Sequence, residues 1–285
     1  MSPDILSSGI ELASQHDGLL LKGFHWDAEN PIAVMSIVHG FGEHCGRYSD
    51  MAAHLNAAGI AVIAVDLRGH GRTEGPRGVC RNYSDMSADA SSLINEAKRI
   101  YPDVPHYLFG HSMGGGLVLH VGLNQNHDLA GYLVSAPLIR PAKPVPAPLK
   151  FILKILRRIM PKGTLANTIP GKQVSKVPDE QVKYEADTLN HDRLGFGLLI
   201  GMLEAGEEVS TRADDWTKPL RLWHAKGDQL TDFTAVKDFA AKAKNCDFTA
   251  FENVEHEVHN DTSRAAVYAL MVDFIKTQNA RDMTA

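Results

Sequence analysis

Short apolar runs alternate with longer amphipathic segments along most of the chain. The clearest run, residues 60–65, is continuously apolar, which indicates a strand covered on both faces. Amphipathic spacing predicts helices as well. This alternation predicts an α/β fold with a mostly parallel, doubly wound sheet, in which ligands lie beyond the carboxyl ends of the strands. The other predicted strands are an early pair at 19–26 and 32–38, then 104–109, 131–135, 220–223 and 248–251, and the predicted helices are 48–58, 86–100 and 263–276.

The alternation stops between residues 138 and 216, where a proline-rich stretch begins. We therefore predict a helical cap inserted at 138–216 into a core formed by 1–137 and 217–285. Residues 140–176 contain nine basic and no acidic side chains. Part of this stretch, residues 149–160, is predicted to form a cationic amphipathic helix. A helix of this kind either rests on anionic lipid or packs its apolar side on the core with its lysines in water, and the sequence leaves both open. The basic face of this helix and its opposite, apolar face consist of Lys150, Lys154, Arg157 and Arg158 and of Phe151, Ile152, Ile155, Leu156 and Ile159, respectively.

Composition narrows the class of protein. The chain has 285 residues, 44% of them apolar, which is enough for one large core, and its net charge of −5 argues against nucleic-acid binding. Three cysteines at no metal-ligand spacing predict neither a disulfide framework nor a zinc site. Residues 1–18 lack a basic-then-apolar signal pattern, and no run approaches the roughly 20 apolar residues of a membrane span. We expect a soluble, cytoplasmic protein that uses no metal or cofactor, with peripheral membrane contact through the cap left open.

Residues 110–114 read Gly-His-Ser-Met-Gly, a G-x-S-x-G pentapeptide between a predicted strand and a glycine-rich helix start. A strand that reverses into a helix within a few residues strains the turn and lifts its central side chain clear of the sheet. Small neighbours make such a turn possible. The pattern favours Ser112 as a nucleophile, whereas the simpler alternative is a serine that only caps a helix.

A serine nucleophile needs a base to take its proton and a carboxylate to orient that base, in the chain order Ser, Asp or Glu, His. Two late loops at the carboxyl edge of the sheet supply candidates. Asp228 is preferred as the acid because it lies nearer its strand than Asp232, which is placed to cap the following helix. His256 is preferred as the base for the same reason, and His259 is interpreted as structural. His256 is expected to be neutral near pH 7.

The negative oxygen that develops during attack on an ester needs backbone N–H donors. One predicted donor is the amide of Met113, the residue after the nucleophile. The second is the amide of Phe41, because residues 39–44 follow an early strand at the place where such hydrolases supply it. Glu43 and His44 are interpreted as residues that brace these loops.

Together these segments resemble the monoglyceride lipases, a family of serine hydrolases with the α/β-hydrolase fold. The resemblance implies hydrolysis of a carboxylic ester, most simply of monoacylglycerol, through an acyl-enzyme intermediate. It assigns Ser112, Asp228 and His256 as the catalytic residues and the amides of Phe41 and Met113 as the oxyanion hole. It also implies a mobile cap, uptake of a lipid ester from membranes, and no cofactor. The matching segments are residues 39–48, 66–78, 110–115, 228–232 and 256–260.

Three positions depart from the pattern of that family: Cys45, Thr73 and Ala225. The cap matches weakly, so a general carboxylesterase and a lysophospholipase are alternatives for the substrate class. A noncatalytic binding protein of the same fold is the alternative from another class. A metallohydrolase is disfavoured because the two late histidines lack H-E-x-x-H spacing. Cys45 beside the oxyanion loop predicts sensitivity to thiol alkylation.

Overall fold

The computed structural model describes residues 7–282, and eight of its strands form one sheet. β2 runs antiparallel to β1 and β4, and the strands from β4 onward are parallel. The predicted mostly parallel sheet is confirmed, and this strand order is that of the α/β-hydrolase fold. From edge to edge the strands are β1 (Ser7–Ala13), β2 (Leu20–Trp26), β4 (Ile60–Val65), β3 (Ala33–Val38), β5 (His106–His111), β6 (Gly131–Ser135), β9 (Leu220–Ala225) and β10 (Cys246–Phe251).

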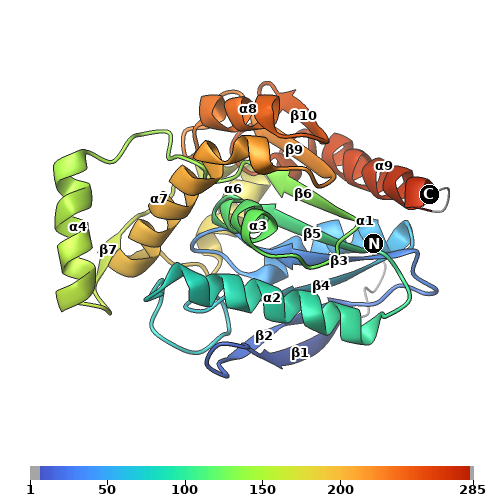
Figure 1. Cartoon of the computed structure of the whole chain (residues 1–285), viewed down its shortest axis with the longest axis horizontal. Coiled ribbons are helices and arrows are strands. Elements are labelled where there is room, and N and C mark those ends of the chain that lie inside the picture. Colours follow the sequence, from blue (N-terminus) through green and yellow to red (C-terminus); the bar gives the residue numbers. More distant parts are fainter. Residues whose placement is uncertain (1–6, 283–285) are drawn as a thin grey trace.

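Helices cover both faces of this sheet, and the two layers can be followed in Figure 1. On one face, α2 (Tyr83–Ile100), α3 (Met113–Asn124) and α8 (Phe233–Lys242) contribute to one apolar cluster. On the other face, α1 (Ser49–Ala57) and α9 (Arg264–Asp282) pack in a second cluster. β3 and β4 are buried along their whole length, which suits their almost entirely apolar sequences, and Ser36 is the one polar residue in the two strands.

The two early strands predicted at 19–26 and 32–38 form β2 and β3, and β4 lies between them in the sheet. Strand β1 was not predicted: its residues are mostly exposed at the edge of the sheet, so its sequence has no apolar run. The predicted core includes residues 1–6 and 283–285, which lie outside the described part of the chain.

Between β6 and β9 the chain leaves the sheet. The segment contains α4 (Ala147–Ile159), β7 (Thr164–Ala166), α5 (Gly171–Val174), α6 (Pro178–Ala186), β8 (Arg193–Gly195) and α7 (Phe196–Thr211). Helix α7 contacts α3 of the core, and α4 packs on α7, so α4 stands at the edge of the molecule in Figure 1. Single 3₁₀ turns lie at Cys45–Tyr48, Ala213–Asp215 and Val258–Asn260.

The orientation of α4 contradicts one of the two sequence interpretations, in which the apolar side packs on the core and the lysines lie in water. Its basic side chains point inward to α7, where Lys150 bonds Glu207 at 3.1 Å and Lys154 bonds Glu204 at 2.9 Å. Arg157 also reaches Glu204, at 3.2 Å. The apolar face is therefore turned outward, and within this helix only Leu153 is buried. Among residues 7–282, no helix is both long enough and apolar enough to cross a bilayer.

Candidate active site

Ser112 occupies the turn between β5 and α3, in a backbone conformation that L-residues rarely adopt (φ 54°, ψ −117°). Its backbone N–H donates to the carbonyl of Ser135 at 2.9 Å, which fixes the turn against β6. A Cβ on Gly114 would collide with the carbonyl oxygens of Val38 and His39, so only glycine allows α3 to begin this close to β3. The sequence thus forces a strained serine to the carboxyl edge of the sheet.

Asp228 and His256, predicted from two loops 28 residues apart, are in contact. The Nδ1 atom of His256 lies 2.6 Å from Oδ2 of Asp228, and both side chains are buried. Burial alone would lower the pKa of His256, but the charge of Asp228 and its hydrogen bond raise that pKa above the ordinary 6.5. Burial would raise the pKa of Asp228, but the charge of His256 and the bonds from the neighbouring imidazoles hold it far below its ordinary value. The pair can therefore orient a base and stabilise its protonated form.

The loop after β3 is held by a buried carboxylate. Oε1 of Glu43 accepts hydrogen bonds from the backbone N–H of Gly40, at 2.5 Å, and from the hydroxyl of Tyr48, at 2.8 Å. Glu43 thereby fixes the segment that contains Phe41, as its predicted bracing role requires. Met113 is the first residue of α3, so its N–H has no partner in the preceding turn of that helix. His44 connects the loop after β3 to the inserted segment, because its Nε2 atom lies 2.8 Å from Oδ2 of Asp187.

An arginine that the sequence analysis did not single out connects two of these loops. Nη1 of Arg47 lies 2.6 Å from Oε2 of Glu43 and 2.5 Å from Oε1 of Glu257, which directly follows His256. The Arg47 side chain is 8% exposed and the two glutamates are buried. Tyr184 of α6 covers the guanidinium, 4.8 Å from the ring centroid. A single sequence does not show which charged residues are buried together, so no signal in the sequence indicates this network.

Ser112 and His256 line the same small cavity, together with Gly40 and Phe41. It encloses about 20 Å³, room for roughly one water molecule. Its outer wall comes from the inserted segment, through Ile169, Val174 and Tyr184. The loop that contains His256 is tied to the same segment, because the N–H of Glu257 donates to the carbonyl of Val174 at 2.8 Å.

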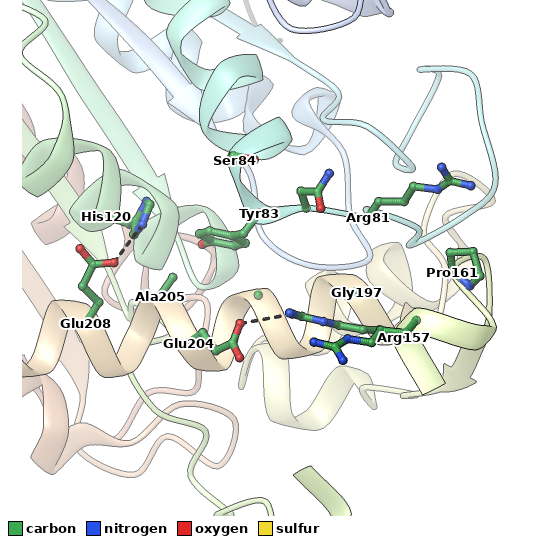
Figure 2. A pocket seen from close by; sticks show the side chains of 13 residues that line it. Arg81, Tyr83, Ser84, His120, Arg157, Pro161, Gly197, Glu204, Ala205 and Glu208 are labelled. Carbon is green, nitrogen blue, oxygen red and sulfur yellow. Dashed lines mark hydrogen bonds and ion pairs between the residues drawn. The ribbon is translucent and has the colours of Figure 1, made fainter. Parts of the chain in front are cut away.

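A much larger cleft, of about 760 Å³, lies elsewhere, between α2, α3, α4 and α7. Figure 2 shows that ion pairs cross it, His120 with Glu208 and Arg157 with Glu204. None of the residues that line it is a predicted site residue. Size alone therefore does not identify the candidate site, and the strained serine and the buried histidine–aspartate contact are the features that single one out.

Cys45 is fully buried, directly after the loop that contains Phe41. Burial, together with the charge of Asp66, raises the pKa of its thiol well above 9.0. Alkylation requires an accessible thiolate, so the structure argues against the predicted sensitivity of Cys45 to thiol reagents.

The strand order and the serine at the strained β5–α3 turn together define the class: this is a serine hydrolase with the α/β-hydrolase fold. Comparisons with known proteins agree. Residues 29–263 match the family described as serine aminopeptidase, S33. A monoacylglycerol lipase of Mycolicibacterium smegmatis is 30% identical over 84% of this chain and 86% of its own length. The chain belongs to the monoglyceride lipase family of serine hydrolases, and it is an ester hydrolase.

Two further comparisons show the extent of the likeness. The crystal structure of Paleococcus ferrophilus monoacylglycerol lipase has a TM-score of 0.79 and 25% identity, covering 95% of this chain and 99% of the other. An uncharacterised abhydrolase domain-containing protein of Dictyostelium discoideum is 33% identical over 88% of this chain. The chain spans only 27% of that relative's length.

Proposed function

We propose that the protein hydrolyses monoacylglycerols through an acyl-enzyme intermediate. Ser112 attacks the ester carbonyl, and His256 takes the hydroxyl proton and gives it to the departing glycerol oxygen. Asp228 orients His256 and stabilises its protonated form. Water, activated by His256, then attacks the acyl-enzyme and releases the fatty acid and Ser112. The observation that carries this proposal is the buried 2.6 Å contact between His256 and Asp228 beside the strained Ser112.

The amides of Phe41 and Met113 are proposed to bind the oxyanion of each tetrahedral intermediate. Support comes from the cavity, which Phe41 and Ser112 both line, and from the place of Met113 at the start of α3. Each such donor contributes on the order of a hundredfold in rate.

The substrate class is tested by one panel. It contains monoacylglycerols of several chain lengths, diacylglycerol, lysophospholipid, an acyl thioester and short nitrophenyl esters, each assayed with the native protein and with Ser112→Ala. The proposal predicts highest kcat/KM on a monoacylglycerol and loss of turnover in the variant. Preference for short soluble esters would favour a carboxylesterase, and preference for lysophospholipid a lysophospholipase. Turnover that persists in Ser112→Ala would overturn the mechanism.

We further propose that residues 138–216 act as a cap that moves to admit substrate. A cavity with room for roughly one water molecule cannot hold an acyl chain. Its apolar cover, Ile169 and Val174, suits contact with such a chain once the cap has opened.

The outward face of α4 is proposed to contact a membrane surface. Phe151, Ile155 and Ile159 are 65%, 45% and 68% exposed, side by side on one helix. Since three of the four basic residues are paired with α7, the contact is mainly apolar rather than electrostatic. The free thiols of all three cysteines, each within the described residues, suit a cytoplasmic location for such a peripheral protein.

Sedimentation with vesicles of phosphatidylcholine and phosphatidylglycerol tests the membrane proposal. Phe151→Ser with Ile159→Ser should release the protein from the vesicles at both low and high salt. Lys150→Gln is the matched control on the other face of α4 and should retain binding. Equal binding of the native protein and the double variant would contradict the proposal.

A further inference from the structure

A second histidine contacts the carboxylate of Asp228. His224 is the fifth residue of β9 and is fully buried. Its Nε2 atom lies 2.9 Å from Oδ2 of Asp228 and 3.2 Å from the hydroxyl of Thr231. The ring of Phe233 packs edge-on against its ring at 5.7 Å. A buried imidazole at this distance from a catalytic carboxylate is a group that the mechanism so far leaves unused.

The two oxygens of Asp228 have different surroundings. Oδ1 accepts from the backbone N–H groups of Leu230, at 2.8 Å, and Thr231, at 3.1 Å. Oδ2 lies within 3.0 Å of three donors, the rings of His256 and His224 and the Thr231 hydroxyl. The backbone bonds fix the position of the carboxylate, and the two imidazoles meet at a single oxygen.

The hydrogen-bond pattern assigns the proton on His224. A carboxylate only accepts, so the facing Nε2 carries the hydrogen. The opposite atom, Nδ1, is buried and has no partner within the described residues. A second proton there would be buried without an acceptor, which is costly. His224 is therefore a neutral Nε2–H donor.

We propose that His224 is a positioning residue that shares Oδ2 of Asp228 with His256 and so limits how tightly that carboxylate holds a proton on His256. This inference rests on the proposed roles of Asp228 and His256. A carboxylate oxygen that accepts a second ring N–H has less charge to offer the first. His256 then stays neutral, and able to accept the proton of Ser112, to a lower pH.

Other charged groups also act on His256. They are the same in every variant of His224, so comparison of two such variants isolates the shared oxygen. Facing the pair are His111 at the end of β5, Glu43 and Arg47 after β3, and Glu255, Glu257 and His259 in the base loop.

Two substitutions test the inference through the pH profile of kcat/KM. His224→Leu removes the donor, and the acid limb should move to higher pH by about half a unit to one unit, a roughly three- to tenfold loss at a fixed pH below the limb. His224→Gln keeps an N–H at similar reach, and its limb should return to the wild-type position. A Leu variant with the wild-type limb would overturn the inference. So would a Gln variant that shifts as far as the Leu variant.

Asp228→Asn, assayed in parallel, separates this inference from the proposed function. Its activity should fall by about 10⁴-fold if Asp228 is the catalytic acid. If Asp228→Asn retains most activity, the proposed function fails. If it is inactive while His224→Leu keeps the wild-type limb, only the role of His224 fails.

Should His224→Leu not fold, ¹⁵N NMR of the native protein provides the test. The expected result is an Nε2–H tautomer for His224 and, above the pH at which His256 loses its second proton, an Nδ1–H tautomer for His256. An Nδ1–H tautomer for His224 would overturn the inference, because that ring would offer Asp228 no proton.

Discussion

The tight turn at Ser112 depends on Gly114, and Gly114→Ala tests that dependence. An added Cβ would collide with two carbonyl oxygens and lie 2.7 Å from the carbonyl carbon of Val38. Carbon atoms in contact are ordinarily about 3.5–4.0 Å apart, so α3 and β3 must separate by roughly 1 Å. Overpacking of this kind costs about 1–3 kcal/mol of folding stability. A displacement of about 1 Å at the nucleophile lowers kcat by about 100-fold.

The assay combines urea unfolding with ester hydrolysis. Gly9→Ala is the matched control, because a Cβ there meets nothing within 4 Å, and it should change stability by less than about 0.5 kcal/mol. If Gly114→Ala unfolds and turns over like the native protein, the close approach of α3 to β3 does not hold Ser112 in place.

Three further outcomes follow from the buried groups around the site. The pKa of His256 is raised above 6.5. Since the base must be neutral to accept a proton, kcat/KM should fall as the pH drops through that raised value. A pH profile of kcat/KM that stays flat down to about pH 5 would contradict this. Arg47→Met leaves two buried carboxylates without their cation and should cost about 3–5 kcal/mol in urea unfolding. Arg99→Met, at an exposed ion pair, should leave the urea midpoint nearly unchanged, and equal shifts of the midpoint in the two variants would refute the argument. Iodoacetamide should leave Cys45 unmodified in the native protein by mass spectrometry, and rapid alkylation would show that it is accessible.

Strands could be predicted from the sequence where a buried segment consists mainly of apolar residues. Strands β4 and β6 have the predicted bounds, because each is a fully buried segment of mainly apolar residues. Helix α2 begins at Tyr83, three residues before its predicted start, since its first turn is polar and lacks the apolar spacing. Strand β1 gave no signal because it is exposed.

The surroundings of the candidate site depend on contacts between distant segments, which periodicity does not encode. The order of serine, aspartate and histidine suggested which residues to examine, and the structure places Asp228 and His256 in contact and Ser112 at the same cavity as His256. The bond from His224 to Asp228 and the bridge through Arg47 arise from the loop geometry alone. Likewise, the pattern of α4 defined two faces but not which one meets the acidic side chains of α7.

The nucleophilic role of Ser112 is tested most directly by reaction with a fluorophosphonate probe, followed by peptide mass mapping. The account predicts a single stoichiometric adduct on Ser112, absent in Ser112→Ala and strongly slowed in His256→Ala. Labelling of a different residue, or equal labelling of the Ser112→Ala variant, would contradict it.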